Sequence, residues 1–409
     1  MKPTGPIPSD FEAIGGELAI AGERVSQLIA AAGETPLFIY DGGIIRNRVA
    51  ALRAAMPAGV AIHYAVKANP HPDVLALLAG LVDGFDVASA GELARAVAAD
   101  ARAISFAGPG KRDHELAAAI DADATINLES EAEADRALRL AAAAGRTAAL
   151  AVRVNPSFAI TGSGMRMGGG ARPFGIDTER VPALVRRLRA AGADWRGFHV
   201  FAGSQSLDAQ AIGDAQSATI ALVAQLAEEV GASPPMVNLG GGFGIPYFAG
   251  DRPLDIAAIG AALGETLARR PAILADSQFA LELGRWLVGE AGVYLARVID
   301  RKISHGETFL VTDGGLHHML AASGNFGTVV RRNYPIAHAG RFGLASEELV
   351  TVTGCLCTPL DLLGDNVGLA RADVGDVIAI FMAGAYSASA SPTAFLNHPP
   401  AGEMLVDTP

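Results

Sequence analysis

The feature that most constrains this chain is a repeated alternation of short apolar runs with alanine-rich stretches of helical periodicity. Eight runs have the length and composition typical of strands, and turn residues flank them. They are 60–66, 84–87, 103–106, 124–126, 148–154, 197–200, 236–239 and 279–281. Between them, the stretches 91–99, 129–144, 178–191 and 207–230 carry apolar residues three and four positions apart. Eight alternating units predict an α/β fold with a parallel (β/α)8 barrel, the TIM barrel, rather than an open doubly wound sheet.

The alternation stops after Arg285. The stretches 293–303, 308–312, 348–355 and 376–381 are strand-like, and turn residues rather than long helical patterns separate them. We therefore predict three regions: a cofactor-binding barrel over 36–283, a mainly β C-terminal domain over 284–409, and an N-terminal segment, 1–35, that packs with the C-terminal domain.

Charge and cysteine content exclude several functional classes. A net charge of −11 argues against a nucleic-acid partner, because phosphate binding needs a basic surface. The two cysteines, Cys355 and Cys357, are too close for an ordinary disulfide framework, and two thiols are too few for a structural zinc site. We expect no metal, and a reducing cytoplasm as the location. No signal peptide and no bilayer-spanning apolar run are apparent, so we expect no membrane association.

The first of the eight runs ends on a single lysine, Lys67. Pro70 then prevents a smooth helical continuation and keeps Asn69 extended. A lysine near the apolar walls of a strand end has a lowered pKa, which frees its amine to form an imine with a carbonyl group. Taken by itself, the stretch fits equally a lysine that ends a strand by reaching into water.

Polar residues and glycines lie at or just after the ends of the other predicted strands, where barrels of this type place their chemistry. In chain order the row reads Lys67, Asp86, Gly108, Asn127, Arg153, His199 with Ser204, Gly240–Gly242, and Glu282 with Arg285. The glycine triplet follows the seventh strand, where such barrels commonly bind phosphate through backbone amides. Ser204 and Arg285 would add a hydroxyl and a guanidinium to the same phosphate.

A phosphate site, an imine-forming lysine and a carboxylate together suit pyridoxal phosphate. A carboxylate beside the pyridine nitrogen keeps it protonated, which makes the ring a strong electron sink for decarboxylation. Taken singly, Glu282 reads as a salt-bridge partner of Arg285, and His199 as a hydrogen-bonded core histidine. Their joint placement favours the cofactor site.

Several motifs then resemble a known family. The segments 63–69, 85–89, 238–244, 282–285 and 384–386 look like the motifs of the alanine-racemase-fold, pyridoxal-phosphate-dependent amino-acid decarboxylases, which include diaminopimelate and ornithine decarboxylases. The segments 162–170 and 199–205 resemble more closely the decarboxylases associated with exosortase A systems. The resemblance covers nearly the whole chain.

The resemblance implies specific roles. Lys67 would hold the cofactor as an internal aldimine and Glu282 would meet the ring nitrogen, with His199 and Cys357 completing the catalytic set. The implied cofactor-binding residues are Lys67, Asp86, Arg153, His199, Ser204, Gly240, Gly241, Gly242, Glu282, Gly284, Arg285 and Tyr386. The segment 354–361 matches the family's Gly-Pro-x-Cys-x-x-x-Asp, so Cys357, Thr358 and Asp361 would reach the active site of the neighbouring subunit in a homodimer.

Three departures from the family bear on the substrate. Phe201 stands where the larger family usually has a histidine stacked on the cofactor ring, so we expect a hydrophobic contact there. Thr358 replaces the glutamate that follows the cysteine in diaminopimelate decarboxylases, and 321–325 replaces their Arg-Pro-x-Leu-Tyr segment. Both losses remove groups that would bind a second charged amino-acid head, which argues against diaminopimelate.

The leading hypothesis is a cytoplasmic, homodimeric decarboxylase that removes the α-carboxylate of a small amino acid or of a carrier-protein-linked amino acid. The alternatives are a diaminopimelate decarboxylase proper, a racemase of the same fold, a cofactor-free Schiff-base aldolase and a non-catalytic homologue. Glu282 argues against the racemase, which would place an arginine at the ring nitrogen. We expect the glycine-rich stretch 155–174 to form a mobile lid. Residues two apart on a strand face the same way, so the sequence leaves open whether Cys355 or Cys357 enters the site.

Overall fold

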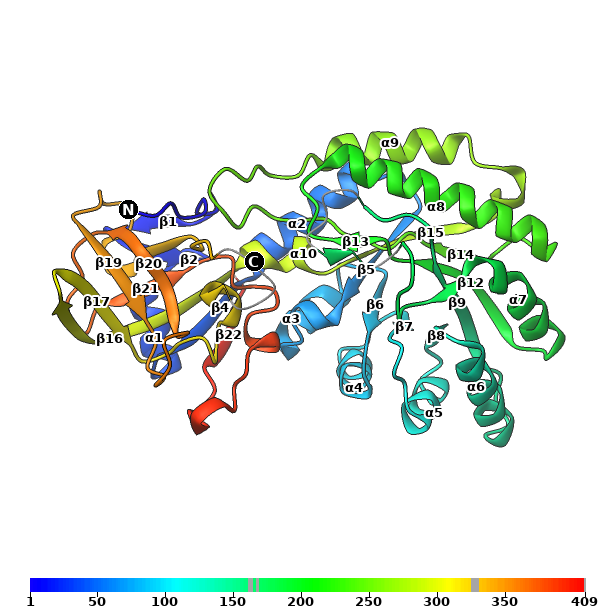
Figure 1. Ribbon diagram of the computed structural model, residues 1–409, viewed down its shortest axis with the longest axis horizontal. Coiled ribbons are helices and arrows are strands. Elements are labelled where there is room, and N and C mark those ends of the chain that lie inside the picture. The colour runs from blue at the N-terminus through cyan, green and yellow to red at the C-terminus, as the bar shows by residue number, and fades with distance from the viewer. Residues whose placement is uncertain (161–164, 167–168, 325–330, 408–409) are drawn as a thin grey trace. The chain divides into compact units, whose positions relative to one another are not determined.

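The computed structural model describes residues 1–160, 165–166, 169–324 and 331–407 (Figure 1). These residues form two compact units. One contains Met1–Arg48, Ile245–Pro253 and Arg285–Pro409, and the other contains Val49–Gly244 and Leu254–Gly284. We call them the β-rich unit and the barrel unit.

The barrel unit is built on a closed ring of parallel strands. In ring order they are β5 (Val60–Ala65), β6 (Gly84–Val87), β7 (Ile104–Phe106), β8 (Thr125–Leu128), β9 (Ala149–Asn155), β12 (Asp194–Val200), β14 (Met236–Asn238) and β15 (Gln278–Leu283). The ring closes because β15 pairs with β5, and β8 pairs with β9. Each strand overlaps one of the eight predicted runs, so the predicted barrel is confirmed and the open doubly wound sheet is wrong.

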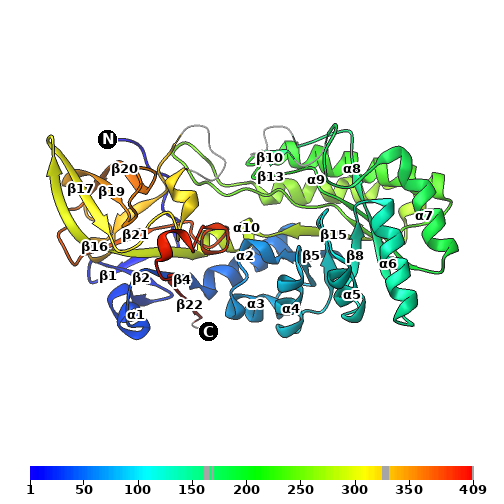
Figure 2. The same cartoon turned by 60° about the horizontal axis from the view of Figure 1, so that its bottom comes forward.

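Helices connect the strands of the barrel. They are α3 (Pro72–Ala79), α4 (Ala90–Ala98), α5 (Asp113–Asp121), α6 (Glu131–Ala143), α7 (Val181–Ala190), α8 (Ala209–Val230) and α9 (Ile256–Ala268), and α2 (Gly42–Ala55) precedes β5. In Figure 2, α8 and α9 lie on one side of the strands and α3 to α6 on the other. Serine caps start two of them: the Ser89 and Ser130 hydroxyls accept the backbone N–H three residues later.

The β-rich unit is organised around β16 (Gly292–Ser304), which pairs with β4 (Leu37–Asp41), β17 (Glu307–Thr312) and β21 (Val377–Ile380). The remaining sheet strands are β18 (Ile336–His338), β19 (Glu348–Thr353), β20 (Leu362–Leu369) and β22 (Gly402–Val406). Smaller elements are β1 (Glu12–Ile14), β2 (Glu17–Ile20), β3 (Glu23–Arg24), α1 (Val25–Ala32) and α10 (Arg285–Val288). The predicted mainly β character is therefore present, and β4, inside the 36–283 range expected for the barrel, pairs with β16 and β22.

The glycine-rich stretch 155–174 is described in part, because residues 161–164 and 167–168 lie outside the described residues. Its two-residue strand β10 (Met165–Arg166) pairs antiparallel with β13 (Gly203–Ser204). The lid expected over this stretch stays a prediction. Among the described helices, none combines the length and the hydrophobicity that crossing a bilayer requires.

Candidate active site

Lys67 leaves the barrel immediately after β5. A short 3-10 turn, Val66–Ala68, carries it, and Asn69 is extended at φ −152° and ψ 107°, as the following Pro70 requires. The Lys67 side chain keeps 46% of its surface exposed, and its Nζ lies 3.9 Å from Glu282 Oε1. The amine is thus placed beside a carboxylate at the strand end and is less enclosed by apolar walls than the sequence suggested.

Glu282 is the buried carboxylate of this group. It lies near the end of β15, and its Oε2 is 2.8 Å from Nε2 of His199 on β12. Burial acts to raise the pKa of Glu282, but the His199 hydrogen bond and the Lys67 charge outweigh it and lower that pKa to about 2. Glu282 is therefore ionised at neutral pH, held on one oxygen by His199 and facing Lys67 with the other.

A second acidic group lies on the neighbouring strand. Asp86 on β6 is buried, and its Oδ2 is 3.7 Å from Nδ1 of His63 on β5. Burial and the nearby Glu282 charge raise the pKa of Asp86. His63 belongs to the motif 63–69, but no role was predicted for it from the sequence. Its position in the sequence could have indicated its place. His63 lies two residues before Ala65, the last residue of β5, and residues two apart on a strand point to the same side.

The glycine loop after β14 packs tightly against its neighbours. Glu282 donates its backbone N–H to Gly240 O at 2.8 Å, and Ser206 donates to Gly242 O at 2.8 Å. An added Cβ would lie 1.9 Å from Glu282 O at Gly241 and 2.6 Å from Gly203 O at Gly242. Larger residues are therefore excluded from this loop by the backbone that surrounds it.

The same loop leaves polar groups without partners. Across the described residues, no hydrogen-bond acceptor is found for the backbone N–H groups of Gly241 and Gly242. The buried Ser204 hydroxyl oxygen likewise lacks a partner within the described chain. Ser204 lies on β13, two residues before Ser206, which forms an isolated β-bridge with Phe243 of the glycine loop. Unpaired amides and a hydroxyl in one place fit a phosphate group, because a buried polar group without a partner is costly.

Phe201 and Gly284 frame the lysine turn. The Phe201 ring centroid is 5.7 Å from Lys67 Nζ, within cation–π range. A Cβ on Gly284 would lie 2.8 Å from the Ala68 Cβ and 3.3 Å from the Ala65 Cβ. Gly284 therefore lets the chain after β15 pass close behind the lysine turn, and the expected contact of Phe201 with the cofactor ring stays a prediction.

Other residues of the predicted polar row bind protein groups instead. Arg153 Nη1 donates to Glu129 Oε1 at 2.7 Å, and its guanidinium lies 5.2 Å from the Phe174 ring. Asn127 donates to Ser105 Oγ at 2.6 Å, and Gly108 N–H also donates to Glu129. These residues lie in the barrel wall, with their polar groups engaged by their neighbours.

Two of the predicted phosphate residues lie in the β-rich unit. Arg285 is the first residue of α10, and its Nη1 donates to the Tyr247 hydroxyl at 2.8 Å. Its guanidinium lies 4.8 Å from the Tyr386 ring and 5.3 Å from the Tyr247 ring. Tyr386 adopts a left-handed backbone, at φ 54°. The two aromatic rings fix the direction of the Arg285 side chain.

The cysteines follow β19 and do not lie on it. The strand ends at Thr353, so the premise that both cysteines alternate along a strand is wrong, and whether they face the same way stays a prediction. Cys357 is exposed, whereas Cys355 is half-buried. Burial, and next the Asp361 charge, raise the pKa of Cys355 to about 11. Cys357, which is exposed, is the more accessible of the two thiols.

Asp361 is the last residue of the segment that carries the cysteines. Its buried carboxylate accepts the backbone N–H groups of Leu316 and Leu356, each at 2.7 Å. Thr358 accepts from the backbone N–H of Leu360. Both side chains therefore shape the loop that carries Cys357, and the contact with the thiol itself is absent from the described hydrogen bonds.

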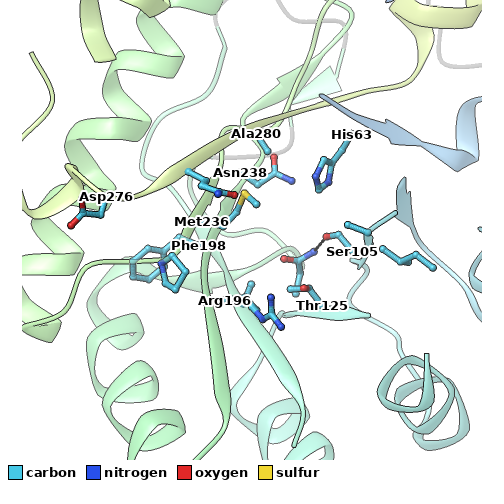
Figure 3. Close-up of a pocket in the computed structure, with 15 residues that line it drawn as sticks. His63, Ser105, Thr125, Arg196, Phe198, Met236, Asn238, Asp276 and Ala280 are labelled. Carbon is cyan, nitrogen blue, oxygen red and sulfur yellow. Dashed lines mark hydrogen bonds between the residues drawn. The ribbon is translucent and has the colours of Figure 1, made fainter. Parts of the chain in front are cut away.

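A cavity of about 440 Å³ lies inside the barrel unit (Figure 3). His63 and Asn238 reach it, and much of its wall comes from residues at strand starts, such as Thr125, Met236 and Gln278. It opens toward the amino-terminal ends of the strands, while Lys67 and Glu282 stand at the carboxyl-terminal ends. His63, which also lies beside Asp86, is a residue that the cavity wall shares with the group around Glu282.

Comparison with known proteins gives a consistent result. Residues 43–289 match the family model described as pyridoxal-dependent decarboxylase, pyridoxal binding domain. The chain is 36% identical over 383 residues to L-glutamyl-[BtrI acyl-carrier protein] decarboxylase of Niallia circulans, which covers 91% of this chain and 89% of that protein. It is 29% identical over 404 residues to diaminopimelate decarboxylase of Aquifex aeolicus, covering 96% and 91%.

The solved structures agree. Diaminopimelate decarboxylase from M. jannaschii in complex with L-lysine superposes with a TM-score of 0.86 at 27% identity, over 98% of this chain and 93% of that one. The racemase and aldolase alternatives lose support, because the matches are named decarboxylases with a pyridoxal-binding domain. The unpaired phosphate-type donors and the Lys67, Glu282 and His199 geometry fit the same cofactor. The chain therefore belongs to the pyridoxal-dependent decarboxylases, enzymes that use pyridoxal phosphate to release carbon dioxide from amino acids.

Proposed function

We propose that this enzyme removes the α-carboxylate of an acidic amino acid that is linked through its side chain to a carrier protein, as a homodimer in the cytoplasm. The observation that carries the decarboxylase site is the group formed by Lys67, Glu282 and His199, with Nζ to Oε1 at 3.9 Å and Oε2 to Nε2 at 2.8 Å. The carrier linkage is supported by the relative at 36% identity, whose name gives a glutamyl carrier protein as its substrate.

The chain's own residues divide the work of holding the cofactor. Bound pyridoxal phosphate supplies an electron sink for the electron pair left when carbon dioxide departs. Lys67 Nζ is the amine that anchors it, and the ionised Glu282 keeps the ring nitrogen protonated. His199 orients Glu282 through its hydrogen bond. The rest of the proposed cofactor-binding set is Asp86, Ser204, Gly240, Gly241, Gly242, Gly284, Arg285 and Tyr386, whereas Arg153, also expected there from the sequence, pairs with Glu129.

The substrate proposal is also supported by what the chain lacks. Thr358 has no charge where diaminopimelate decarboxylases carry a glutamate. The turn Leu320–Ser323 and the following Gly324 contain no arginine. A free diaminopimelate would therefore leave its second charged head without these partners, at a cost of several kcal/mol when desolvated. A conjugate has no such head to satisfy.

The substrate test compares free and conjugated amino acids on the holoenzyme. Carbon dioxide release is measured with L-glutamyl thioesters of pantetheine and of a carrier protein, and with free glutamate, lysine, ornithine and diaminopimelate. We expect kcat/KM for a glutamyl thioester to exceed that for every free amino acid by at least about 100-fold, the discrimination typical of a site whose buried polar groups must be matched. Faster turnover of free diaminopimelate would reject the carrier proposal and leave the decarboxylase assignment in place.

Cys357 is the candidate donor of the proton that replaces carbon dioxide at the α-carbon. Its exposure, together with the loop held by Asp361, supports its presentation to a neighbouring subunit. Covering an open barrel mouth also excludes water from the carbanion. Each active site of the homodimer would then combine Lys67 of one chain with Cys357 of the other.

Mixing two inactive variants tests the shared site. Lys67→Ala and Cys357→Ala are each expected to lose activity, and subunit exchange between them creates mixed dimers with one intact site. About a quarter of wild-type activity should return if exchange is complete, because half of the dimers are mixed and each has one of two sites intact. Exchange proven by mass-tagged subunits without any return of activity would mean that Cys357 acts within its own chain or has no catalytic role.

A further inference from the structure

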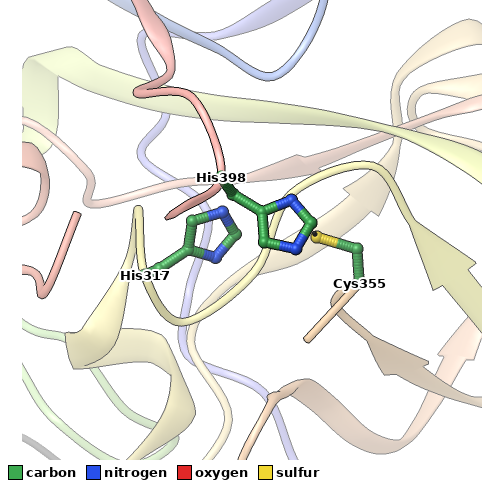
Figure 4. A group of neighbouring side chains, drawn as sticks. All are labelled: His317, Cys355 and His398. Atoms are coloured by element: carbon green, nitrogen blue, oxygen red, sulfur yellow. Dashed lines mark hydrogen bonds between the residues drawn. The ribbon is translucent and has the colours of Figure 1, made fainter. Parts of the chain in front are cut away.

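Three side chains that can bind metals meet in the β-rich unit. They are His317, Cys355 and His398, and one ligand atom from each lies within 4.8 Å of the others (Figure 4). Cys355 Sγ is 3.9 Å from His398 Nδ1, and the two imidazole ring centroids are 5.2 Å apart. The group joins three segments that are far apart in the sequence.

His317 is the observation that points to a ligand. Its side chain is completely buried, yet neither Nδ1 nor Nε2 has a hydrogen-bond partner in the described part of the chain. A buried imidazole normally bonds through at least one nitrogen, because leaving both unpaired costs free energy. His318, the next residue, meets this rule: its Nδ1 is 3.1 Å from the Tyr294 hydroxyl and its Nε2 is 2.9 Å from Pro399 O.

The backbone around the three side chains is held by other groups. Asp361 accepts N–H groups from Leu316 and Leu356, the residues that adjoin His317 and Cys355. A Cβ on Gly315 or Gly354 would collide with the Asp361 carboxylate, at 2.3 Å in both cases. The loops that carry His317 and Cys355 are thus fixed to one carboxylate at close range.

His318 anchors the segment that carries the third candidate ligand, His398. It bonds to the carbonyl of Pro399, which follows His398 in the chain. All three candidate ligands are therefore positioned by hydrogen bonds that do not use their own ligand atoms. The ligand atoms of His317 are thus left available by the hydrogen bonds that hold the surrounding backbone.

We propose that His317, Cys355 and His398 bind one zinc ion. One thiolate and two imidazoles are the ligand types that zinc prefers, with a tetrahedral geometry that places ligand atoms roughly 3.5 Å apart. The observed spacing needs small side-chain rotations to reach it. Binding displaces the proton of the Cys355 thiol to solvent, and a water molecule takes the fourth position.

The proposed ion has a structural consequence for the loop after β19. Cys357 lies two residues beyond Cys355, so the ion would fix the loop that carries the exposed thiol. Zinc binding itself does not depend on the proposed function. The effect on catalysis does, because it rests on Cys357 as the proton donor.

The test measures zinc on the full-length holoenzyme. The protein is treated with a chelator, titrated with Zn²⁺ alone, freed of unbound metal and analysed by atomic emission, and a chromophoric chelator gives the affinity by competition. We expect one zinc per chain. Cys355→Ser should weaken binding by more than the roughly 10–100-fold that loss of an outer-shell partner produces. The matched thiol control Cys357→Ser, and His305→Asn on the β16–β17 turn, should keep one zinc per chain.

A second readout covers the case in which Cys355→Ser does not fold. Cobalt replaces zinc in the wild-type holoenzyme, and a thiolate-to-cobalt charge-transfer band in the difference spectrum reports Cys355 as a ligand; the band should be lost in His398→Asn as cobalt binding weakens. Wild-type protein that takes up no zinc, or Cys355→Ser that binds zinc as tightly as wild type, would overturn the proposal. These metal measurements are independent of turnover, so failure of the decarboxylase substrate tests leaves them unaffected.

Discussion

Two groups of polar side chains stand near the carboxyl-terminal ends of the barrel strands, and they differ in how completely their hydrogen bonds are satisfied. In one, Lys111 Nζ donates to Gly108 O at 2.7 Å, to Asn127 O at 2.9 Å and to Glu133 Oε1 at 2.9 Å. These bonds use all three donors of its ammonium group. In the same group Arg153 pairs with Glu129 at 2.7 Å.

The second group, around Lys67 and Glu282, keeps several atoms unpaired within the described chain. They include Oδ1 of Asp86, Nδ1 of His199 and the hydroxyl oxygen of Ser204. The saturated group supports the barrel wall, whereas the unsaturated group has donors and acceptors left for a ligand. Both groups contain a lysine and a glutamate, so residue type alone does not tell a structural group from a binding site. The presence or absence of hydrogen-bond partners does.

The largest expected effect is on the unsaturated group. Lys67→Ala should lower decarboxylation on the order of 10⁴-fold or more, as loss of a covalently acting residue typically does, and should remove the visible absorbance of the bound cofactor. The melting temperature of the cofactor-free protein should stay close to that of wild type, since the Lys67 side chain is 46% exposed. A variant that keeps both the absorbance and the activity would contradict the role of Lys67.

A substitution in the saturated group, around Lys111, should lower stability and leave cofactor binding unchanged. Lys111→Met leaves Glu133 buried without its partner, so we expect the free energy of unfolding to fall by about 3–5 kcal/mol. Urea denaturation measures the loss. The folded fraction should still bind pyridoxal phosphate with wild-type absorbance, and a loss of cofactor without a loss of stability would place Lys111 in the binding site instead.

A smaller effect is expected from pH. The Glu282 pKa is lowered from 4.5 to about 2, with burial opposing the shift and the His199 bond and Lys67 charge producing it. A carboxylate with a depressed folded-state pKa contributes stability that is complete above its ordinary value and is lost as the pH falls toward the folded value. Unfolding of the cofactor-free protein should therefore lose stability between about pH 4.5 and pH 2 more steeply in wild type than in Glu282→Gln. Parallel curves would show that Glu282 titrates with an ordinary pKa.

The sequence by itself determined the barrel and the row of residues at its active end. Strand and helix periodicities are local properties, so runs such as 84–87 and 148–154 could be located without knowing their partners. Parallel strands in a closed barrel align their carboxyl ends, which placed Lys67, His199 and Glu282 together before any distance was known. The motifs then supplied the cofactor.

Only the tertiary structure decided which polar side chains have hydrogen-bond partners within the protein. The sequence put Arg153 and Asn127 in the same row as Glu282, but their hydrogen-bond partners, Glu129 and Ser105, lie on other segments of the barrel. Burial and pairing depend on groups that are distant in the chain, and no local pattern reports them.

Dependence on groups that are distant in the chain also explains why the exposure of the cysteines and the cluster of His317, Cys355 and His398 were not predicted from the sequence. Cys355 and Cys357 were expected on a strand, and the end of β19 at Thr353 gave them different exposures. Counting thiols gave no metal site, because the two histidines that meet Cys355 come from residues 317 and 398. Contacts between segments so far apart are set by how the β-rich unit folds, and this folding depends on packing over the whole unit rather than on the pattern of any one segment.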